Sequence, residues 1–149
     1  MKLTSFTDYT LRVLMYLALD PQRLATISGI AEAYGISENH LMKVVHHLAK
    51  SGVVESLRGK GGGIRLALPP EQIHIGQVVR EAEGDSAIVE CFSDHNTCRI
   101  APHCKLTGVL SRAFAALYAS LDEVTLADLV VRPQPLMRML HVERLTIAR

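Results

Sequence analysis

Residues 26–68 carry the pattern that most constrains the fold of this chain. Apolar residues recur at helical spacing over 26–34, and Gly35 suits the left-handed conformation that ends a helix. Ser37 can cap a further helix that ends at Gly52. The inner face of this second helix consists of Leu41, Val44, Val45 and Leu48. Two short helices joined by a turn that contains glycine predict a helix-turn-helix.

Two alternating runs follow the helix-turn-helix, VVESL at 53–57 and IRLAL at 64–68. The segment between them, RGKGGG at 58–63, combines two basic side chains with four glycines. Alternation on either side of a glycine cluster predicts a β-hairpin with a long basic tip. A hairpin placed directly after the second helix of a helix-turn-helix is a wing.

Three further helices are expected around this unit. The first opens the chain and is stopped by Asp20-Pro21, and another spans 75–83. A third begins at Leu106 and places apolar residues on two sides over four turns. Because a helix that is apolar on two sides needs two partners, we expect it to pack on its own domain and on a second subunit.

The C-terminal part is expected to hold a short helix capped by Thr125 to Asp128, a break at Pro133 and Pro135, and a short frayed helix at the end. The predicted fold class is therefore mainly α with a small β wing. It comprises a winged helix-turn-helix DNA-binding domain over 1–84, a cysteine loop over 85–105, and a dimerisation helix with short C-terminal helices over 106–149.

Basic residues gather between His40 and Leu66, where five Lys or Arg stand against the single acid Glu55, although the whole chain carries a net charge of only +1. We expect the outward face of the second helix of the motif to lie in the major groove of duplex DNA, while the wing holds phosphates or enters the minor groove. A winged helix that contacts a protein is the alternative. The candidate DNA-binding residues are Ser37, Asn39, His40, Lys43, His46, Arg58, Lys60, Gly61 and Gly62.

All three cysteines lie within ECFSDHNTCRIAPHCKL, residues 90–106, separated by six and then five residues. Structural zinc sites favour closer cysteine pairs, whereas iron-sulfur clusters tolerate wider loops. The spacing alone leaves an iron-sulfur cluster, a zinc site and a thiol switch open, and His95 or His103 could complete a metal site. The odd number of thiols, with no apolar run long enough for a membrane span, favours a cytoplasmic protein with reduced cysteines. No nucleophile with a paired base is evident, so we do not expect an enzyme.

Five segments, LTSFTDYTLRVLMYLA, NHLMKVVHHLAKSG, RGKGGGIRL, IHIGQVVREAEG and CRIAPHCKL, together resemble the nitric-oxide-sensing iron-sulfur repressors of a winged-helix regulator family that also includes IscR. The resemblance extends to about Val130. It implies a homodimer with one four-iron, four-sulfur (4Fe-4S) cluster per subunit on Cys91, Cys98 and Cys104. It also implies that the dimer binds an inverted-repeat, A/T-rich operator, and that nitric oxide destroys the cluster and releases the DNA, so that nitric-oxide detoxification genes are transcribed.

The resemblance further implies a fourth cluster ligand from the opposite subunit, at the position of Asp8. Two local roles compete for this side chain, a capping box with Ser5 and an i,i+4 ion pair with Arg12. An IscR-like protein would have a histidine ligand three residues after the last cysteine, where this chain has Thr107, which favours the nitric-oxide-sensing branch.

Other functions remain compatible with the pattern. A winged-helix repressor could be switched by oxidation of its thiols, or by iron-sulfur or redox status without specificity for nitric oxide. A zinc-stabilised interaction module and an electron-carrying iron-sulfur protein belong to other classes. Measurements of the iron content, the zinc content and the affinity for DNA would distinguish these alternatives.

Overall fold

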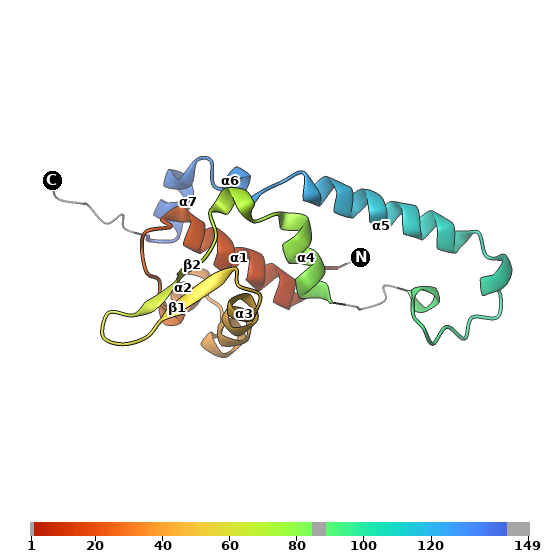
Figure 1. The fold of residues 1–149 in the computed structure, drawn as a ribbon, viewed down its shortest axis with the longest axis horizontal. Helices are drawn as coiled ribbons and strands as arrows, with labels where there is room; N and C mark the ends of the chain where they lie inside the picture. The colour runs from red at the N-terminus through yellow and green to blue at the C-terminus, as the bar shows by residue number, and fades with distance from the viewer. Residues whose placement is uncertain (1, 85–88, 143–149) are drawn as a thin grey trace.

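The computed structural model describes residues 2–84 and 89–142 (Figure 1). Seven α-helices, two strands and three short 3₁₀ turns are found in these ranges. They are, in chain order, α1 (Ser5–Leu19), α2 (Ile27–Tyr34), α3 (Glu38–Lys50), β1 (Val54–Leu57), β2 (Gly63–Leu66), η1 (Pro70–Gln72), α4 (Ile75–Glu83), η2 (Glu90–Phe92), η3 (Ala101–His103), α5 (Leu106–Asp122), α6 (Leu126–Leu129) and α7 (Pro133–Met139). The predicted fold class, mainly α with a small β wing, is confirmed.

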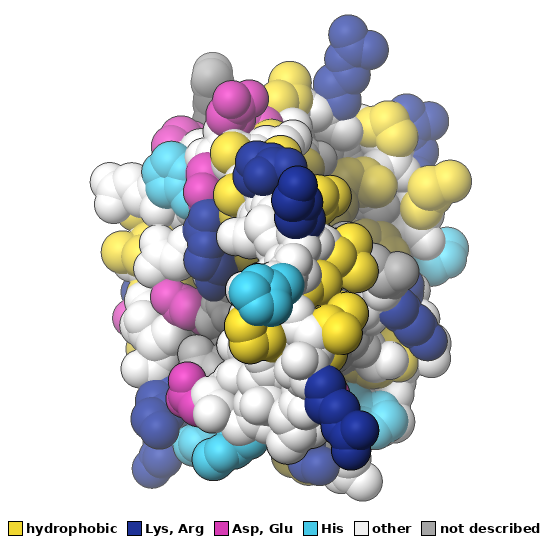
Figure 2. All heavy atoms as spheres, turned by 90° about the vertical axis from the view of Figure 1, so that its right-hand side faces the viewer, with side chains coloured by type: hydrophobic (Ala, Val, Ile, Leu, Met, Phe, Trp, Pro, Cys, Tyr) yellow, Lys and Arg dark blue, Asp and Glu magenta, His cyan; other side chains and the backbone are white. Residues whose placement is uncertain are grey.

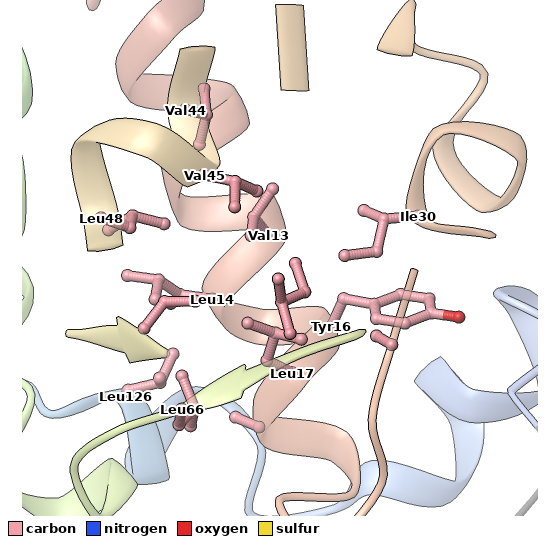
Figure 3. Packing of buried hydrophobic residues seen from close by; sticks show 14 of the residues in the cluster. Val13, Leu14, Tyr16, Leu17, Ile30, Val44, Val45, Leu48, Leu66 and Leu126 are labelled. Atoms are coloured by element: carbon pink, nitrogen blue, oxygen red, sulfur yellow. The ribbon is translucent and has the colours of Figure 1, made fainter. Parts of the chain in front are cut away.

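Helix α1 forms the centre of the hydrophobic core. Val13 and Leu14 are fully buried, and residues of α2, α3, the wing and the C-terminal helices surround them (Figure 3). Leu126 of α6 and Met137 of α7 belong to the same core, so the chain beyond α5 returns to pack on the N-terminal helices. The predicted domain boundaries after residues 84 and 105 stay predictions.

The helix-turn-helix forms at the predicted residues. Gly35 ends α2 in the left-handed conformation, with a φ of 65°, and Ser37 caps α3. All four predicted inner residues of α3 are buried: Leu41, Val44, Val45 and Leu48. The local signals at this turn were therefore sufficient to place both helices.

The two strands pair antiparallel, with Val54 opposite Leu66 and Leu57 opposite Gly63. Ala25, just before α2, forms a bridge with Ile64, which ties the wing to the helix-turn-helix. At the tip, a Cβ atom on Gly62 would lie 2.2 Å from the Leu57 carbonyl oxygen. This position therefore requires glycine, because a side chain would collide with backbone.

The starts of two helices, α1 and α7, differ from what the sequence predicted. Thr4, and not Ser5, caps α1, because the Thr4 side chain accepts a hydrogen bond from the Thr7 amide at 3.2 Å. Pro133 and Pro135 do not break the chain but lie in the first turn of α7. Proline is tolerated there because the first amides of a helix have no intrahelical partner.

Helix α5 extends from the body, and only its C-terminal part lies beside α4 (Figure 1). The cysteine loop lies at its far end, beyond the rest of the molecule. Among the described residues, no helix is long and apolar enough to span a bilayer.

Candidate nucleic-acid interface and cysteine loop

Helix α3 is amphipathic, and the face opposite its buried residues is open to solvent. Asn39, Lys43 and His46 are exposed on that face. Ser37 is exposed too, but its hydroxyl already accepts a hydrogen bond from the His40 amide at 3.3 Å. The predicted recognition face is thus present as a surface, with Ser37 fixing where the helix begins.

Two histidines of α3 pack against aromatic side chains of α1. The ring of His40 lies 5.9 Å from that of Tyr9, and the ring of His47 meets that of Phe6 edge-on at 5.3 Å. Both aromatic residues flank Asp8 on α1. The recognition helix therefore rests on the turn of α1 that contains the candidate cluster ligand.

The wing tip places its two basic side chains in solvent. Arg58, Lys60 and Gly61 are exposed, and Gly62 is half-buried, with its amide donating to the Gly59 carbonyl at 3.0 Å. Of the wing cations, Arg65 is the one paired, at 2.5 Å from Glu55. Among the residues that the structure describes, Lys43, Arg58 and Lys60 form no ion pair.

The cysteine loop is held by contacts within itself and with α5. The Glu90 carboxylate accepts hydrogen bonds from the Thr97 amide at 2.8 Å and the Thr97 hydroxyl at 2.5 Å. Those two bonds, the hydroxyl one foremost, lower the pKa of Glu90. Phe92 packs edge-on against Phe114 of α5, with ring centroids 6.3 Å apart. The loop is thus attached to the helix that follows it.

All three cysteines are free thiols, with Cys98 exposed and Cys91 and Cys104 half-buried. Three cysteines on one loop, none of them in a disulfide, are a suitable donor set for an iron-sulfur cluster. Within 2–84 and 89–142, however, no three His, Cys, Asp or Glu side chains lie close enough to hold a metal ion. The donor chemistry fits the cluster, and in the single chain the ligands are not preassembled, as is common where metal binding orders a site.

Asp8 takes one of its two predicted local roles. Its carboxylate lies 2.9 Å from the Arg12 guanidinium, which confirms the i,i+4 pair, while the capping box with Ser5 is wrong because Thr4 is the cap. His95 and His103 are exposed on the loop. Neither histidine nor Asp8 joins the cysteines in a metal-holding group within the described single chain.

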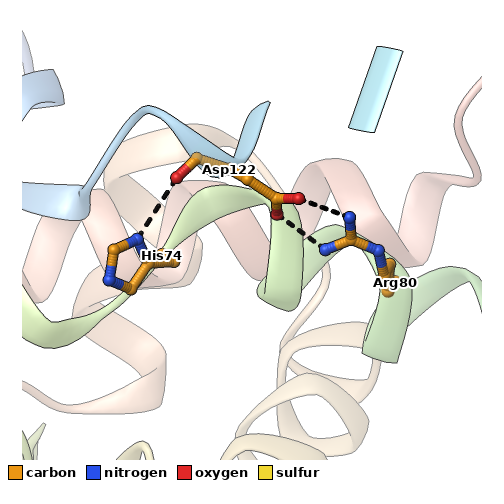
Figure 4. Close-up of polar contacts among 3 residues, drawn as sticks. All are labelled: His74, Arg80 and Asp122. Atoms are coloured by element: carbon orange, nitrogen blue, oxygen red, sulfur yellow. Dashed lines mark hydrogen bonds and ion pairs between the residues drawn. The ribbon is translucent and has the colours of Figure 1, made fainter. Parts of the chain in front are cut away.

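Helices α4 and α5 are joined by a contact that sequence reasoning did not predict. The two terminal nitrogens of the Arg80 guanidinium, Nη1 and Nη2, donate to the Asp122 carboxylate at 2.7 and 2.5 Å, and Nδ1 of His74 lies 3.3 Å from the Asp122 carbonyl oxygen (Figure 4). The Arg80 guanidinium also covers the Tyr118 ring at 4.5 Å. The hydrogen bonds from Arg80 lower the pKa of Asp122. These contacts of His74 and Arg80 with Asp122 and Tyr118 hold the C-terminal part of α5 against α4.

Gly76 permits this close approach. A Cβ atom there would lie 1.9 Å from Asp122 Oδ1 and 2.9 Å from the Asp122 amide nitrogen. We expect Gly76→Ala to displace Asp122 from Arg80 and to lower the free energy of unfolding by about 1–3 kcal/mol, as overpacking usually does. Urea denaturation measures the change. Gly108→Ala in α5 is the matched control, because among the described residues a Cβ there meets the tip of Arg112 alone, at 3.7 Å. Equal losses of stability in both variants would contradict the steric argument.

The start of α1 is fastened to the last residue of α4. Glu83 accepts hydrogen bonds from the Thr4 amide at 2.8 Å, from the Thr4 hydroxyl at 3.0 Å and from the Thr7 hydroxyl. Partial burial raises the pKa of Glu83, but the bonds from Thr7 and Thr4 outweigh this effect, so the pKa lies below its usual value of 4.5. The helix that carries Asp8 is therefore tied to the segment that leads into the cysteine loop.

A pH dependence of stability follows from this depressed pKa. The stabilisation by the Glu83 carboxylate is fully present above the usual pKa of 4.5 and is lost as the pH falls through the lower folded-state value. We expect Glu83→Gln to have a lower melting temperature than the native protein at neutral pH. The difference between the two melting temperatures should decrease in acid. Thermal melts across pH test this prediction. Glu81→Gln is the control, because Glu81 accepts a hydrogen bond from Gln77 of its own helix and, within the described part of the chain, forms no ion pair. A difference in melting temperature that does not change with pH would contradict the stabilising role assigned to the Glu83 carboxylate.

Comparison with known proteins connects these features to a family. The family model described as Rrf2, iron-dependent transcriptional regulator, matches residues 3–132. The HTH-type transcriptional regulator NsrR of Bacillus subtilis (strain 168) is 52% identical over 145 residues, which make up 96% of this chain and 99% of that protein. The solved structure of T. potens IscR is 25% identical with a TM-score of 0.72 and covers 100% of this chain and 93% of that one. The oxidised form of Staphylococcus aureus CymR is 28% identical with a TM-score of 0.69, covering 87% and 95% of the two chains.

Proposed function

Because the chain belongs to the Rrf2 family of transcriptional regulators, we propose that it is a cytoplasmic, homodimeric repressor whose iron-sulfur cluster senses nitric oxide. Its relatives are transcriptional regulators and not enzymes. The DNA target is a duplex operator with an inverted, A/T-rich repeat, and the regulated genes serve nitric-oxide detoxification. Each part of this proposal rests on a different region of the chain.

DNA binding is supported by one observation above all, the unpaired basic side chains on the recognition face and the wing. Lys43 of α3 and Arg58 and Lys60 of the wing tip are exposed, and no ion pair in the described ranges occupies them. Such cations neutralise phosphates and release counterions, which is the main source of affinity for DNA. Asn39 and His46, on the same face of α3, are positioned to meet base edges.

A second copy of the chain is the partner that suits α5. In the single chain none of its residues is buried, and Leu106 and Val109 are 58% and 49% exposed. Figure 2, which views this end of the molecule, shows hydrophobic side chains open to solvent. Because an inverted repeat requires two-fold symmetry in the protein that binds it, we assign this apolar face to a dimer interface.

For the cluster, the proposed ligands are Cys91, Cys98 and Cys104, with Asp8 reaching over from the other subunit. When bound, the cluster supplies iron that reacts with nitric oxide. Asp8 has to leave its ion pair with Arg12 to serve as a ligand; both side chains are more than 40% exposed, so that pair is a weak competitor. A carboxylate is a hard, weakly held ligand for iron, which suits a displaceable position.

Release of DNA follows from where the loop lies in the chain. The loop joins α4 to α5, and Glu83 ties the end of α4 to the start of α1. The α1 residues on either side of Asp8 contact His40 and His47 of the recognition helix. A rearranged loop therefore shifts the recognition helix relative to α5. Since DNA requires half-sites about 34–36 Å apart, a modest shift is enough to prevent both recognition helices from docking together.

Selection from a random duplex library tests the DNA-binding part of the proposal. Protein purified without oxygen is expected to enrich an inverted repeat, with two chains bound per duplex in sedimentation experiments. Enrichment of no common sequence would contradict the assignment as a specific repressor. Enrichment of a single half-site bound by one chain would contradict the dimer alone.

A thiol switch is the second candidate, because all three cysteines are free and Cys98 is exposed. The similar CymR from Staphylococcus aureus has been solved in an oxidised form, so oxidation occurs in a protein of this fold. Under this alternative, iron-free protein would lose operator affinity on oxidation and regain it on reduction. A zinc-stabilised interaction module would instead contain stoichiometric zinc and bind no DNA.

A further inference from the structure

Met42 is an apolar side chain displayed on a polar surface. It is 49% exposed, while Leu41 directly before it and Val44 two residues after it are fully buried. Among the described large hydrophobic residues of α3, Met42 is the one that is exposed. The hydrophobic core therefore does not account for its presence.

Its position is central on the proposed DNA-reading surface. Met42 follows Asn39 by three residues and precedes His46 by four, so the three side chains form one stripe along the helix. It is the fifth residue of α3, which begins at Glu38, and the N-terminal part of a recognition helix is the part that meets base edges. Helix α5, proposed as the dimer interface, lies on the opposite side of the body from α3 (Figure 1).

The major groove offers one apolar group among its hydrogen-bonding edges, the C5-methyl group of thymine. A flexible thioether can fit closely around a methyl group, and both lose unfavourable contact with water when they meet. We propose that Met42 is a specificity-determining residue that recognises a thymine methyl group in each half-site. This inference rests on the proposed DNA binding and adds to it the chemistry of one base contact.

Replacing thymine by deoxyuridine tests the proposal, because it removes the methyl group and leaves every hydrogen bond in place. Starting from the duplex selected by the native protein, each thymine is replaced in both half-sites and affinity is measured by fluorescence anisotropy. We expect one thymine position to weaken native binding by about fourfold per half-site, the equivalent of about 0.8 kcal/mol for one buried methyl group. Met42→Gln is expected to bind the two duplexes equally, and Met42→Leu to retain the discrimination.

Met139→Gln provides the matched control, since Met139 is 77% exposed but lies on α7. It should discriminate thymine from deoxyuridine as the native protein does. The proposal is overturned if the native protein shows no such discrimination, or if Met42→Gln keeps it. If the native protein selects no operator, the proposed function itself is contradicted. If it binds an operator without recognising a thymine methyl group, only the role of Met42 is contradicted.

Discussion

Replacing Cys98 by serine is expected to remove bound iron and sulfide and, with them, specific operator binding. Serine is a poor ligand for iron in place of a thiolate, and two remaining cysteines leave too few protein ligands to hold a cluster. The substitution leaves the local structure intact, because Cys98 is exposed and its backbone amide, not its thiol, donates the hydrogen bond to Asn96. Operator affinity should fall to the non-specific level, a loss of about 1000-fold or more.

The control for this prediction is His103→Ala. His103 is exposed on the same loop, next to Cys104, and the sequence left it open as a further metal ligand. We expect this variant to keep the iron and sulfide content and the operator affinity of the native protein. A Cys98→Ser protein that retains the full cluster would contradict the proposed ligand set, and a His103→Ala protein that loses it would show that a ligand had been missed.

The second large effect is expected from the wing. In a dimer, Arg58→Ala combined with Lys60→Ala removes four cations that we assign to phosphate contacts. At about 1 kcal/mol for each of these four cations, affinity should fall by roughly 1000-fold. The slope of log affinity against log salt should decrease by about 0.9 for each phosphate that is no longer neutralised. Because phosphates carry no sequence information, the weakening should be similar for every operator variant.

A charge-matched control separates this effect from a change in net charge. Arg132→Ala combined with Arg138→Ala removes two exposed cations at α7, away from the recognition face. This variant should bind DNA with the native affinity and salt slope. If both double variants weaken binding equally, the wing has no specific role and the affinity depends only on overall charge.

Local sequence signals predicted most of the helix-turn-helix and wing, because the residues that define them are neighbours in the chain. Gly35 and Ser37 specify a helix end and a helix start within three residues, and Thr125 with Asp128 forms the predicted capping box. At the start of α1, however, the spacing from Ser5 to Asp8 indicated the wrong cap, since Thr4 caps this helix. Tertiary contacts decided there, since Glu83 binds Thr4.

The contacts that fix the site geometry were not predictable in this way. Arg80 and Asp122 are 42 residues apart, and no spacing rule relates them. Gly76 gave no turn signal either, because it matters for the space it leaves to Asp122 and not for its backbone conformation. The cysteine spacing identified candidate ligands, yet ligand assembly depends on the metal and on a second subunit, which one chain does not contain.

Operator binding before and after nitric oxide, measured on one anaerobically purified sample together with its iron, sulfide and visible absorption, tests the central claim most directly. We expect a protein with broad absorption at about 400 nm that binds the selected operator tightly, and that loses both its absorption and its specific binding when nitric oxide is added. Tight operator binding that is equal in cluster-containing, nitric-oxide-treated and iron-free protein would contradict the proposed sensor.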